Sequence, residues 1–217
     1  MKTSIIERAL LISLILGAWP VRGEIIDRVA AVVGRLPITR SEVQKEARLE
    51  AFFSHRPAPS ARLSAADADS RAVLERLIRQ RLIRYEMEQT QFPSADDAQV
   101  EKWLREQGVT LAAAPDYGLT EQDLADYGRR QIDILRFVDL RFKSGVEIPA
   151  QQVDAYYEHT LLPELARRAV AERPPLDQVR GQIKQILVEE QTNELLDNWL
   201  AELRTHMLVR VMEIEQP

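Results

Sequence analysis

The chain has no cysteine and little glycine, and these absences exclude several classes of protein. Its 217 residues include 8 glycines and no cysteine. Disulfide bonds, thiolate nucleophiles and cysteine-ligated zinc sites are therefore excluded. So few glycines are unusual for an all-β protein or for a protein with a glycine-rich phosphate loop. With 45% hydrophobic and 29% charged residues, the composition is that of an ordinary soluble globular protein.

An excess of positive charge and a catalytic motif are also missing. The formal net charge is −5 at pH 7, whereas binding to nucleic acid depends on a basic surface, so no nucleic-acid partner is expected. The three histidines, His55, His159 and His206, have neither a second histidine nor a carboxylate at metal-ligand spacing. Motifs of serine hydrolases, P-loop proteins and dinucleotide-binding Rossmann proteins do not occur. We therefore expect no metal, no cofactor and no catalytic residue.

The first 23 residues have the organisation of a secretory signal. Lys2 and Arg8 give a positively charged start, and a mostly apolar run from Ala9 to Trp19 follows. That run is too short to span a bilayer comfortably. We expect residues 1–23 to be cleaved as a signal peptide, which leaves residues 24–217 as a secreted chain without a stable membrane span. An uncleaved anchor or a buried helix is the alternative.

The stretch from Glu24 to Val43 predicts a short hairpin followed by the start of a helix. Its β-branched residues suit strands, Gly34 suits the turn between them, and Pro37 restricts the second strand to a sheet edge. A Thr-x-x-Glu pattern beginning at Thr39 is typical of a capping box. Because an isolated hairpin is marginal in water, a third strand is expected. The only good candidate is the last apolar run, Leu208 to Ile214.

Between its two ends the chain is predicted to be almost entirely helical. Apolar residues recur at helical spacing, and proline, glycine or capping patterns separate the segments. The expected helices cover Thr39–Phe53, Ala65–Gln91, a segment capped by Ser94 and ended by Gly108, Thr120–Lys143, a segment that starts at Pro149, and Leu176–His206. The predicted fold class is mainly α, with a small β-sheet formed by the N-terminal hairpin and the C-terminal strand.

Apolar stripes predict which side of two of these helices faces the core. The stripe of the helix that starts at Thr120 contains Leu124, Tyr127, Ile134, Leu135, Val138 and Phe142. The last long helix has two stripes, formed by Leu176, Val179, Ile183, Ile186 and Leu187, and then by Leu195, Leu196, Trp199, Leu200 and Leu203. Residues at such spacing lie on one face of a helix, so we expect them to be buried.

Aromatic residues and methionine are the remaining candidates for function. They are spread over the helical body, and packing in the core is the ordinary interpretation. A second interpretation is that some of them line an exposed groove that accepts extended apolar segments. Adjacent aromatic pairs favour it, because both members of a pair cannot face one side of a helix. The candidate substrate-binding residues are Phe52, Phe53, Met87, Trp103, Tyr156 and Tyr157.

Several segments of the chain together carry a family resemblance. They are DRVAAVVGRLPITRSEV (Asp27–Val43), LERLIRQRLIRYE (Leu74–Glu86), VEIPAQQVDAYYE (Val146–Glu158), and PLDQVRGQIKQILVEEQ, WLAELR and VRVMEI near the C-terminus. In this order they resemble the SurA-type periplasmic chaperones, relatives of the parvulin-type prolyl isomerases. The resemblance implies a periplasmic location and one helical chaperone domain over residues 24–217. An N-terminal part, residues 24–145, would be closed by a return helix and strand within residues 146–217.

The chain departs from that family at one place. Family members usually carry one or two parvulin domains before the final long helix, and such a domain needs roughly a hundred residues. Only Glu158 to Pro175 separates the flanking segments here, and this stretch contains no glycine. This departure leaves no place for the isomerase active site, and it therefore argues against the enzymatic activity of the family.

The function implied is that of an ATP-independent chaperone, which binds unfolded outer-membrane or secreted polypeptides in apolar grooves between its helices. The alternatives are a peptidyl-prolyl isomerase and a dedicated subunit of one envelope complex. The sequence also leaves open whether the closing helix and strand pair with their own hairpin or with a second chain, as in a swapped homodimer.

Overall fold

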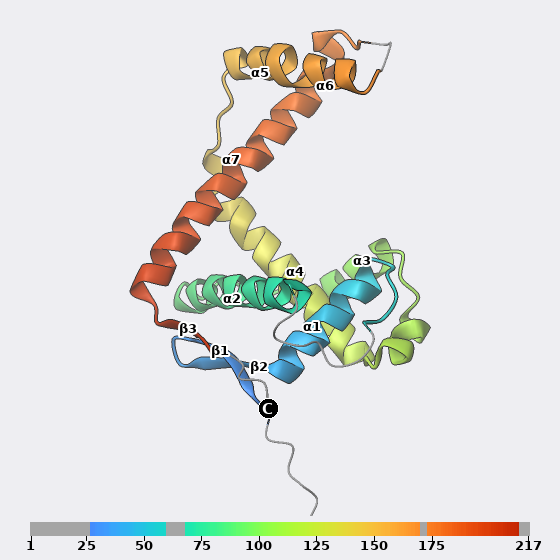
Figure 1. The fold of residues 1–217 in the computed structure, drawn as a ribbon, viewed down its shortest axis with the longest axis vertical. Helices are drawn as coiled ribbons and strands as arrows, with labels where there is room; N and C mark the ends of the chain where they lie inside the picture. Colours follow the sequence, from blue (N-terminus) through green and yellow to red (C-terminus); the bar gives the residue numbers. More distant parts are fainter. Residues whose placement is uncertain (1–26, 60–67, 170–172, 213–217) are drawn as a thin grey trace, which may run out of the picture.

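The computed structural model describes residues 27–59, 68–169 and 173–212 (Figure 1). Its elements are β1 (Val29–Val33), β2 (Leu36–Thr39), α1 (Arg40–Phe53), α2 (Ala68–Gln89), α3 (Asp97–Glu106), α4 (Glu121–Arg141), α5 (Ala150–Tyr156), α6 (Leu162–Arg167), α7 (Leu176–His206) and β3 (Val209–Val211). Short 3-10 helices cover Leu111–Tyr117 and Lys143–Gly145, and a π-helical turn covers Tyr157–Leu161. The fold is mainly helical with one small sheet, as predicted. The signal predicted for residues 1–23 lies outside the described residues.

The small sheet joins the two ends of the described chain. Its strand order is β2-β1-β3, and both pairings are antiparallel. Val33 lies opposite Val209, and Ala31 lies opposite Val211. Gly34 takes a φ of 62° in the turn after β1, a conformation that costs glycine little. The predicted pairing of the C-terminal strand with the hairpin is confirmed.

The main core lies where α2 crosses the sheet. Apolar side chains of β1, β2, α1 and α2 form one buried cluster, to which α4 adds Phe137 and α7 adds Leu200. Ile78 and Leu82 of α2 are completely buried. Helix α2 is therefore covered on more than one side, and it is the element around which the body of the protein is packed. Within the described residues, no helix is both long and apolar enough to cross a bilayer.

The two halves of α7 have different surroundings. Its 31 residues make a rod of about 46 Å at the usual rise per residue. The C-terminal half runs beside α2, where Arg79 pairs with Asp197 at 2.5 Å and Arg204 pairs with Glu75. The N-terminal half projects from the body and carries α5 and α6 (Figure 1). We call α5, the π-helical turn, α6 and this half of α7 the arm.

The core of the arm is small. Val153 of α5 and Ile183 of α7 are its buried residues. An ion pair between Arg180 and Asp154, 3.2 Å apart, joins the same two helices. Because so little apolar surface is enclosed, the position of the arm depends on the continuity of α7 rather than on packing against the body.

Four local predictions differ from the structure, two at helix ends and two on helix faces. Ser94 does not cap α3, because its hydroxyl donates to the buried Asp133 at 2.5 Å. Asp96 is the cap instead and forms a capping box with Gln99. At the start of α1, Thr39 accepts from the backbone N–H of Glu42, but the Glu42 carboxylate binds Arg81, so only half of the expected capping box exists.

The expected stripe of α4 is wrong at Leu135. Its side chain is 61% exposed, whereas that of Phe137 is 4% exposed. Residues two positions apart point to nearly opposite sides of a helix, and the core lies on the side of Phe137. The stripes of α7 also include two exposed residues, Ile186 and Leu195, because only part of that helix touches the body.

Two leucines of α7 should contribute differently to the free energy of unfolding, because only one of them packs into the core of the body. Leu200→Ala should lower the free energy of unfolding by about 2–5 kcal/mol, because a cavity forms in the core; the leucine is 3% exposed. Leu195→Ala, at a position that is 41% exposed, is the matched control and should cost less than about 1 kcal/mol. Urea denaturation measures both, and equal losses would contradict this packing.

Candidate functional site

Three of the six candidate residues lie together in an aromatic cluster at the end of α1. Phe53 stacks on Tyr127 with ring centroids 4.7 Å apart, and Trp103 lies 5.2 Å from Phe53. Phe52 packs edge to face on Tyr117, at 5.2 Å. Both phenylalanines therefore join one cluster, which the sequence argument did not expect. The cluster wraps around the last turn of α1, so adjacent side chains can reach it from both sides.

The cluster is tightest where α3 meets α4. A Cβ atom at Gly128 would lie 2.9 Å from the ring of Trp103. Glycine therefore allows the indole to lie against the backbone of α4. This close approach fixes Trp103 and, through it, the partly exposed ring of Phe53.

The other candidates lie elsewhere. Met87 is buried in the main core, and Phe52 is buried as well, so neither offers contact area in this conformation. Tyr156 and Tyr157 are partly buried on the arm, where the hydroxyl of Tyr157 donates to the carbonyl of Pro174 at 2.9 Å. The six residues are thus divided among three places, which are the aromatic cluster at the end of α1, the main core and the arm. The structure does not assemble them into one site.

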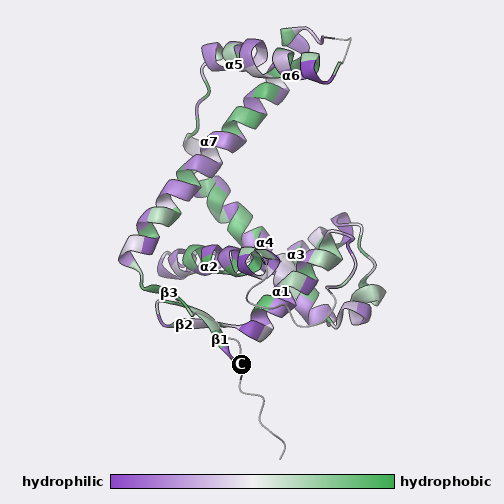
Figure 2. Ribbon diagram, in the orientation of Figure 1, coloured by the Kyte–Doolittle hydropathy of each residue, from purple (hydrophilic) through white to green (hydrophobic). Residues whose placement is uncertain are grey.

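Exposed apolar side chains form a set that sequence reasoning missed. The largest exposures in this set are on α4, where Leu135 is 61% and Leu140 is 67% exposed. Exposed members on other elements include Ile186 and Leu195 of α7, and Leu208, Val211 and Met212 around β3. Figure 2 shows hydrophobic residues along the part of α4 that approaches α7. Helical spacing assigned three of these residues to core stripes, and nothing in the local sequence marks them as exposed.

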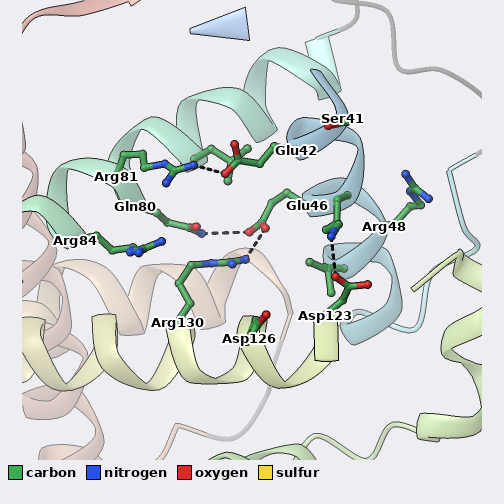
Figure 3. A pocket seen from close by; sticks show the side chains of 13 residues that line it. Ser41, Glu42, Glu46, Arg48, Gln80, Arg81, Arg84, Asp123, Asp126 and Arg130 are labelled. Carbon is green, nitrogen blue, oxygen red and sulfur yellow. Dashed lines mark hydrogen bonds and ion pairs between the residues drawn. The ribbon is translucent and has the colours of Figure 1, made fainter. Parts of the chain in front are cut away.

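The linings of two cavities in the body are rich in charged groups. The first, about 370 Å³, lies between α1, α2 and α4 (Figure 3). Its lining includes Glu42, Lys45, Arg48, Arg81, Arg84, Asp123 and Asp126. A second cavity of about 360 Å³ shares Arg84, Asp126 and Arg130 with it. These two cavities therefore do not supply the apolar groove that the sequence led us to expect.

Glu46 is the buried charge of the first cavity. Its side chain, reaching from α1, accepts hydrogen bonds from Arg130 of α4 at 2.6 Å and from Gln80 of α2 at 3.3 Å (Figure 3). Burial raises the pKa of Glu46, and the attraction of Arg130 opposes that rise. The signal in the sequence was a glutamate three residues after Val43, on the apolar side of α1. Glu46 therefore ties three helices together.

A second ion pair in this cavity joins α1 to the start of α4. The Lys45 ammonium donates to Asp123 at 2.7 Å, and Asp123 also completes the capping box with Thr120. Burial alone would raise the pKa of Asp123, but the hydrogen bonds from Lys45 and Thr120 outweigh it and lower the pKa to about 2. The charges of this cavity are thus largely neutralised by one another.

The buried carboxylates of the body are paired with hydrogen-bond donors. Each buried carboxylate that is described is hydrogen-bonded: Glu46 to Arg130 and Gln80, and Asp133 to Ser94 and a backbone N–H. Among the residues that the structure describes, no three histidine or acidic side chains are placed to share a metal ion. The two cavities are thus lined mainly by charged side chains, several of which pair with one another.

The hydrogen bonds that Glu46 accepts from Arg130 and Gln80 predict that two substitutions of Glu46 will lower stability by different amounts. Glu46→Ala should lower the free energy of unfolding by about 3 kcal/mol, because it leaves Arg130 without its partner. Glu46→Gln should cost less, since glutamine still accepts from Arg130. Burial raises the folded-state pKa of Glu46, so wild type should lose stability relative to Glu46→Gln as the pH rises above the ordinary glutamate pKa. Urea titrations from about pH 4 to about pH 7 measure both effects, and a difference that grows with pH in favour of wild type would contradict the burial.

The lowered pKa of Asp123 predicts the opposite pH dependence. Its stabilising effect should be complete above the ordinary pKa of 3.8 and should disappear as the pH falls towards about 2. Asp123→Asn should therefore be less stable than wild type near neutral pH and match it in strong acid. Lys45→Met, which removes the donor and the positive charge, should show part of the same loss. A constant difference at all pH values, followed by circular dichroism, would rule out this role.

Comparison with known proteins assigns no family to the chain. No family model matches the sequence, and no curated protein matches it either.

Proposed function

We propose that the protein is an ATP-independent chaperone of the periplasm that holds unfolded outer-membrane or secreted polypeptides. One observation carries this proposal: large apolar side chains are exposed on α4 and α7, the helices that connect the body to the arm. Each of these exposed side chains offers apolar area that an apolar segment of another polypeptide can cover. The segments that resemble SurA-type chaperones support the same function.

The exposed side chains are held on rigid supports. The ring centroids of Trp199 in α7 and Phe142 lie 5.4 Å apart. The guanidinium of Arg141 lies 5.1 Å from the centre of the Trp199 ring. These contacts fix the end of α4 against α7. Leu140 is next to this junction, so it is presented without the loss of backbone freedom that a loop would suffer on binding.

The proposed mechanism is shielding of apolar segments by many weak contacts. Leu135 and Leu140 lie on different sides of α4, so a client meets separate small apolar areas. Binding at each is weak, and it adds along an extended client that touches several of them. The partly exposed Phe53, Trp103, Tyr156 and Tyr157 add aromatic contacts on the body and the arm. No nucleotide and no covalent step is part of this mechanism.

Suppression of aggregation tests the proposal. The purified protein, at a few-fold excess, should keep a diluted, unfolded β-barrel protein in solution, as followed by light scattering. The double variant Leu135→Ser/Leu140→Ser should need several-fold more protein for the same effect. Leu111→Ser is the matched control, since that leucine is 40% exposed on another element. Failure of the wild type to suppress aggregation would reject the proposed function.

Two further assays separate the alternative functions. Turnover of a proline peptide in an isomerisation assay would favour the prolyl isomerase. Recovery of one stoichiometric partner in a pull-down, without a range of unfolded proteins, would favour a dedicated subunit of an envelope complex. The proposed chaperone should give neither result.

A further inference from the structure

The two edges of the small sheet differ. Strand β1 lies in the middle, so β2 and β3 are the edge strands. The β2 edge contains Pro37, which has no backbone N–H and blocks addition of a strand. The β3 edge, Val209–Val211, contains no proline. Only the β3 edge is therefore chemically open.

Backbone groups of β3 point towards that open edge. Gly34 N–H donates to the carbonyl of Leu208 at 2.8 Å, and Met212 N–H donates to the carbonyl of Ala30 at 2.9 Å. Alternate residues of an antiparallel strand bond to the same neighbour, so the bonding groups of Val209 and Val211 point away from β1. No described residue pairs with them. They form a short template for another strand.

The side chain of Val211 shows what such a strand would cover. Val211 lies in register with Ala31, which in turn lies opposite Ile38. Ala31 and Ile38 are completely buried, so this is the core face of the sheet, yet Val211 is 54% exposed. Its exposure arises because the described chain places nothing beyond β3. An added strand would put a side chain beside Val211 and extend the core layer by one position.

The charge of Arg210 distinguishes two possible occupants of the β3 edge, a second copy of this chain and a segment of a different polypeptide. In a two-fold pairing of two copies centred on Arg210, the two guanidinium groups would lie directly opposite each other, which is destabilising. An acidic residue of a different chain at that position would be attracted instead. Leu208 and Met212 flank Arg210 on the same face, and both are exposed. The edge therefore suits an extended segment with an acidic residue opposite Arg210 and apolar residues on its other face.

We propose that β3 accepts one extended segment of a client polypeptide by strand addition. This proposal rests on the proposed chaperone function, because clients would supply the segment. Main-chain hydrogen bonds at Val209 and Val211 would provide affinity that is independent of sequence, while Arg210 and Val211 would favour an acidic residue between two apolar ones. The sheet that closes the fold is thereby also a binding element.

Amide hydrogen exchange tests the proposal on the unmodified protein. The probe is a fluorescein-labelled peptide with the sequence Thr-Thr-Val-Glu-Val-Thr-Thr. At saturation, exchange at the Val209 and Val211 amides should slow by about tenfold or more. The Arg210 amide, which faces β1, should change little and is the internal control. Peptide binding without protection of Val209 and Val211 would overturn the proposal.

Methylated peptides test the direction of the hydrogen bonds. N-methylation of both valines of the probe should abolish binding, because in this register their N–H groups point at β3. N-methylation of the glutamate should leave binding intact, because its N–H points away. Fluorescence anisotropy measures both, and equal affinity of the two methylated peptides would contradict strand addition.

Protein variants give an independent test. Val211→Pro removes an outward N–H without touching the ladder to β1, and it should weaken peptide binding about tenfold. Val211→Thr keeps the donor and the branched side chain, so it should bind as wild type does. Arg210→Glu should prefer a probe with lysine at the central position. Undiminished binding by Val211→Pro would overturn the proposal.

These results are separable from the test of the chaperone function. If Val211→Pro binds the peptide as tightly as wild type while suppression of aggregation persists, strand addition is wrong and the chaperone function stands. If the wild type fails to suppress aggregation, the chaperone function is wrong, and exchange at Val209 and Val211 still decides whether the edge binds a strand. Protection that rises with protein concentration in the absence of peptide would assign the edge to a second copy and would overturn the proposal.

Discussion

The pairing of β1 with β3 is the interaction on which the rest of the structure depends. A hairpin of β1 and β2 alone would be marginal in water, and β3 supplies the third strand that makes it a sheet. The same strand fixes the C-terminal end of α7, so Leu200 and Trp199 meet the core formed by α2 and α4. The position of the arm is fixed in turn, because α7 continues as one helix from the sheet to its contacts with α5.

Local signals were sufficient to locate the strands and the long helices. The bounds Leu176–His206 were predicted as they are found for α7, because a proline pair precedes the helix and its apolar spacing is regular. The capping box of Thr120 and Asp123 likewise placed the start of α4. Such patterns depend on residues within a few positions of each other, so a single sequence contains them.

Exposure and long-range charge pairing could not be predicted in the same way. Leu135 and Phe137 are both apolar, and only the position of the core tells which one is buried. The pair formed by Glu46 and Arg130 joins residues that are far apart in sequence. The six candidate binding residues were chosen by residue type alone, which does not tell an exposed aromatic side chain from a buried one. Two of them, Phe52 and Met87, are core residues. Sequence patterns describe one helix at a time, and a surface is made by several.

The wide separation of β1 and β3 along the chain has a consequence for how the molecule matures. Contacts between residues so distant in sequence form slowly, because a long loop must close first. Until Val209 and its neighbours have been synthesised, Val33 and part of α2 lack the packing that β3 and the C-terminal half of α7 provide. A nascent or truncated polypeptide without β3 would therefore leave apolar core side chains in contact with water, so the fold can close only after the strand that is synthesised last.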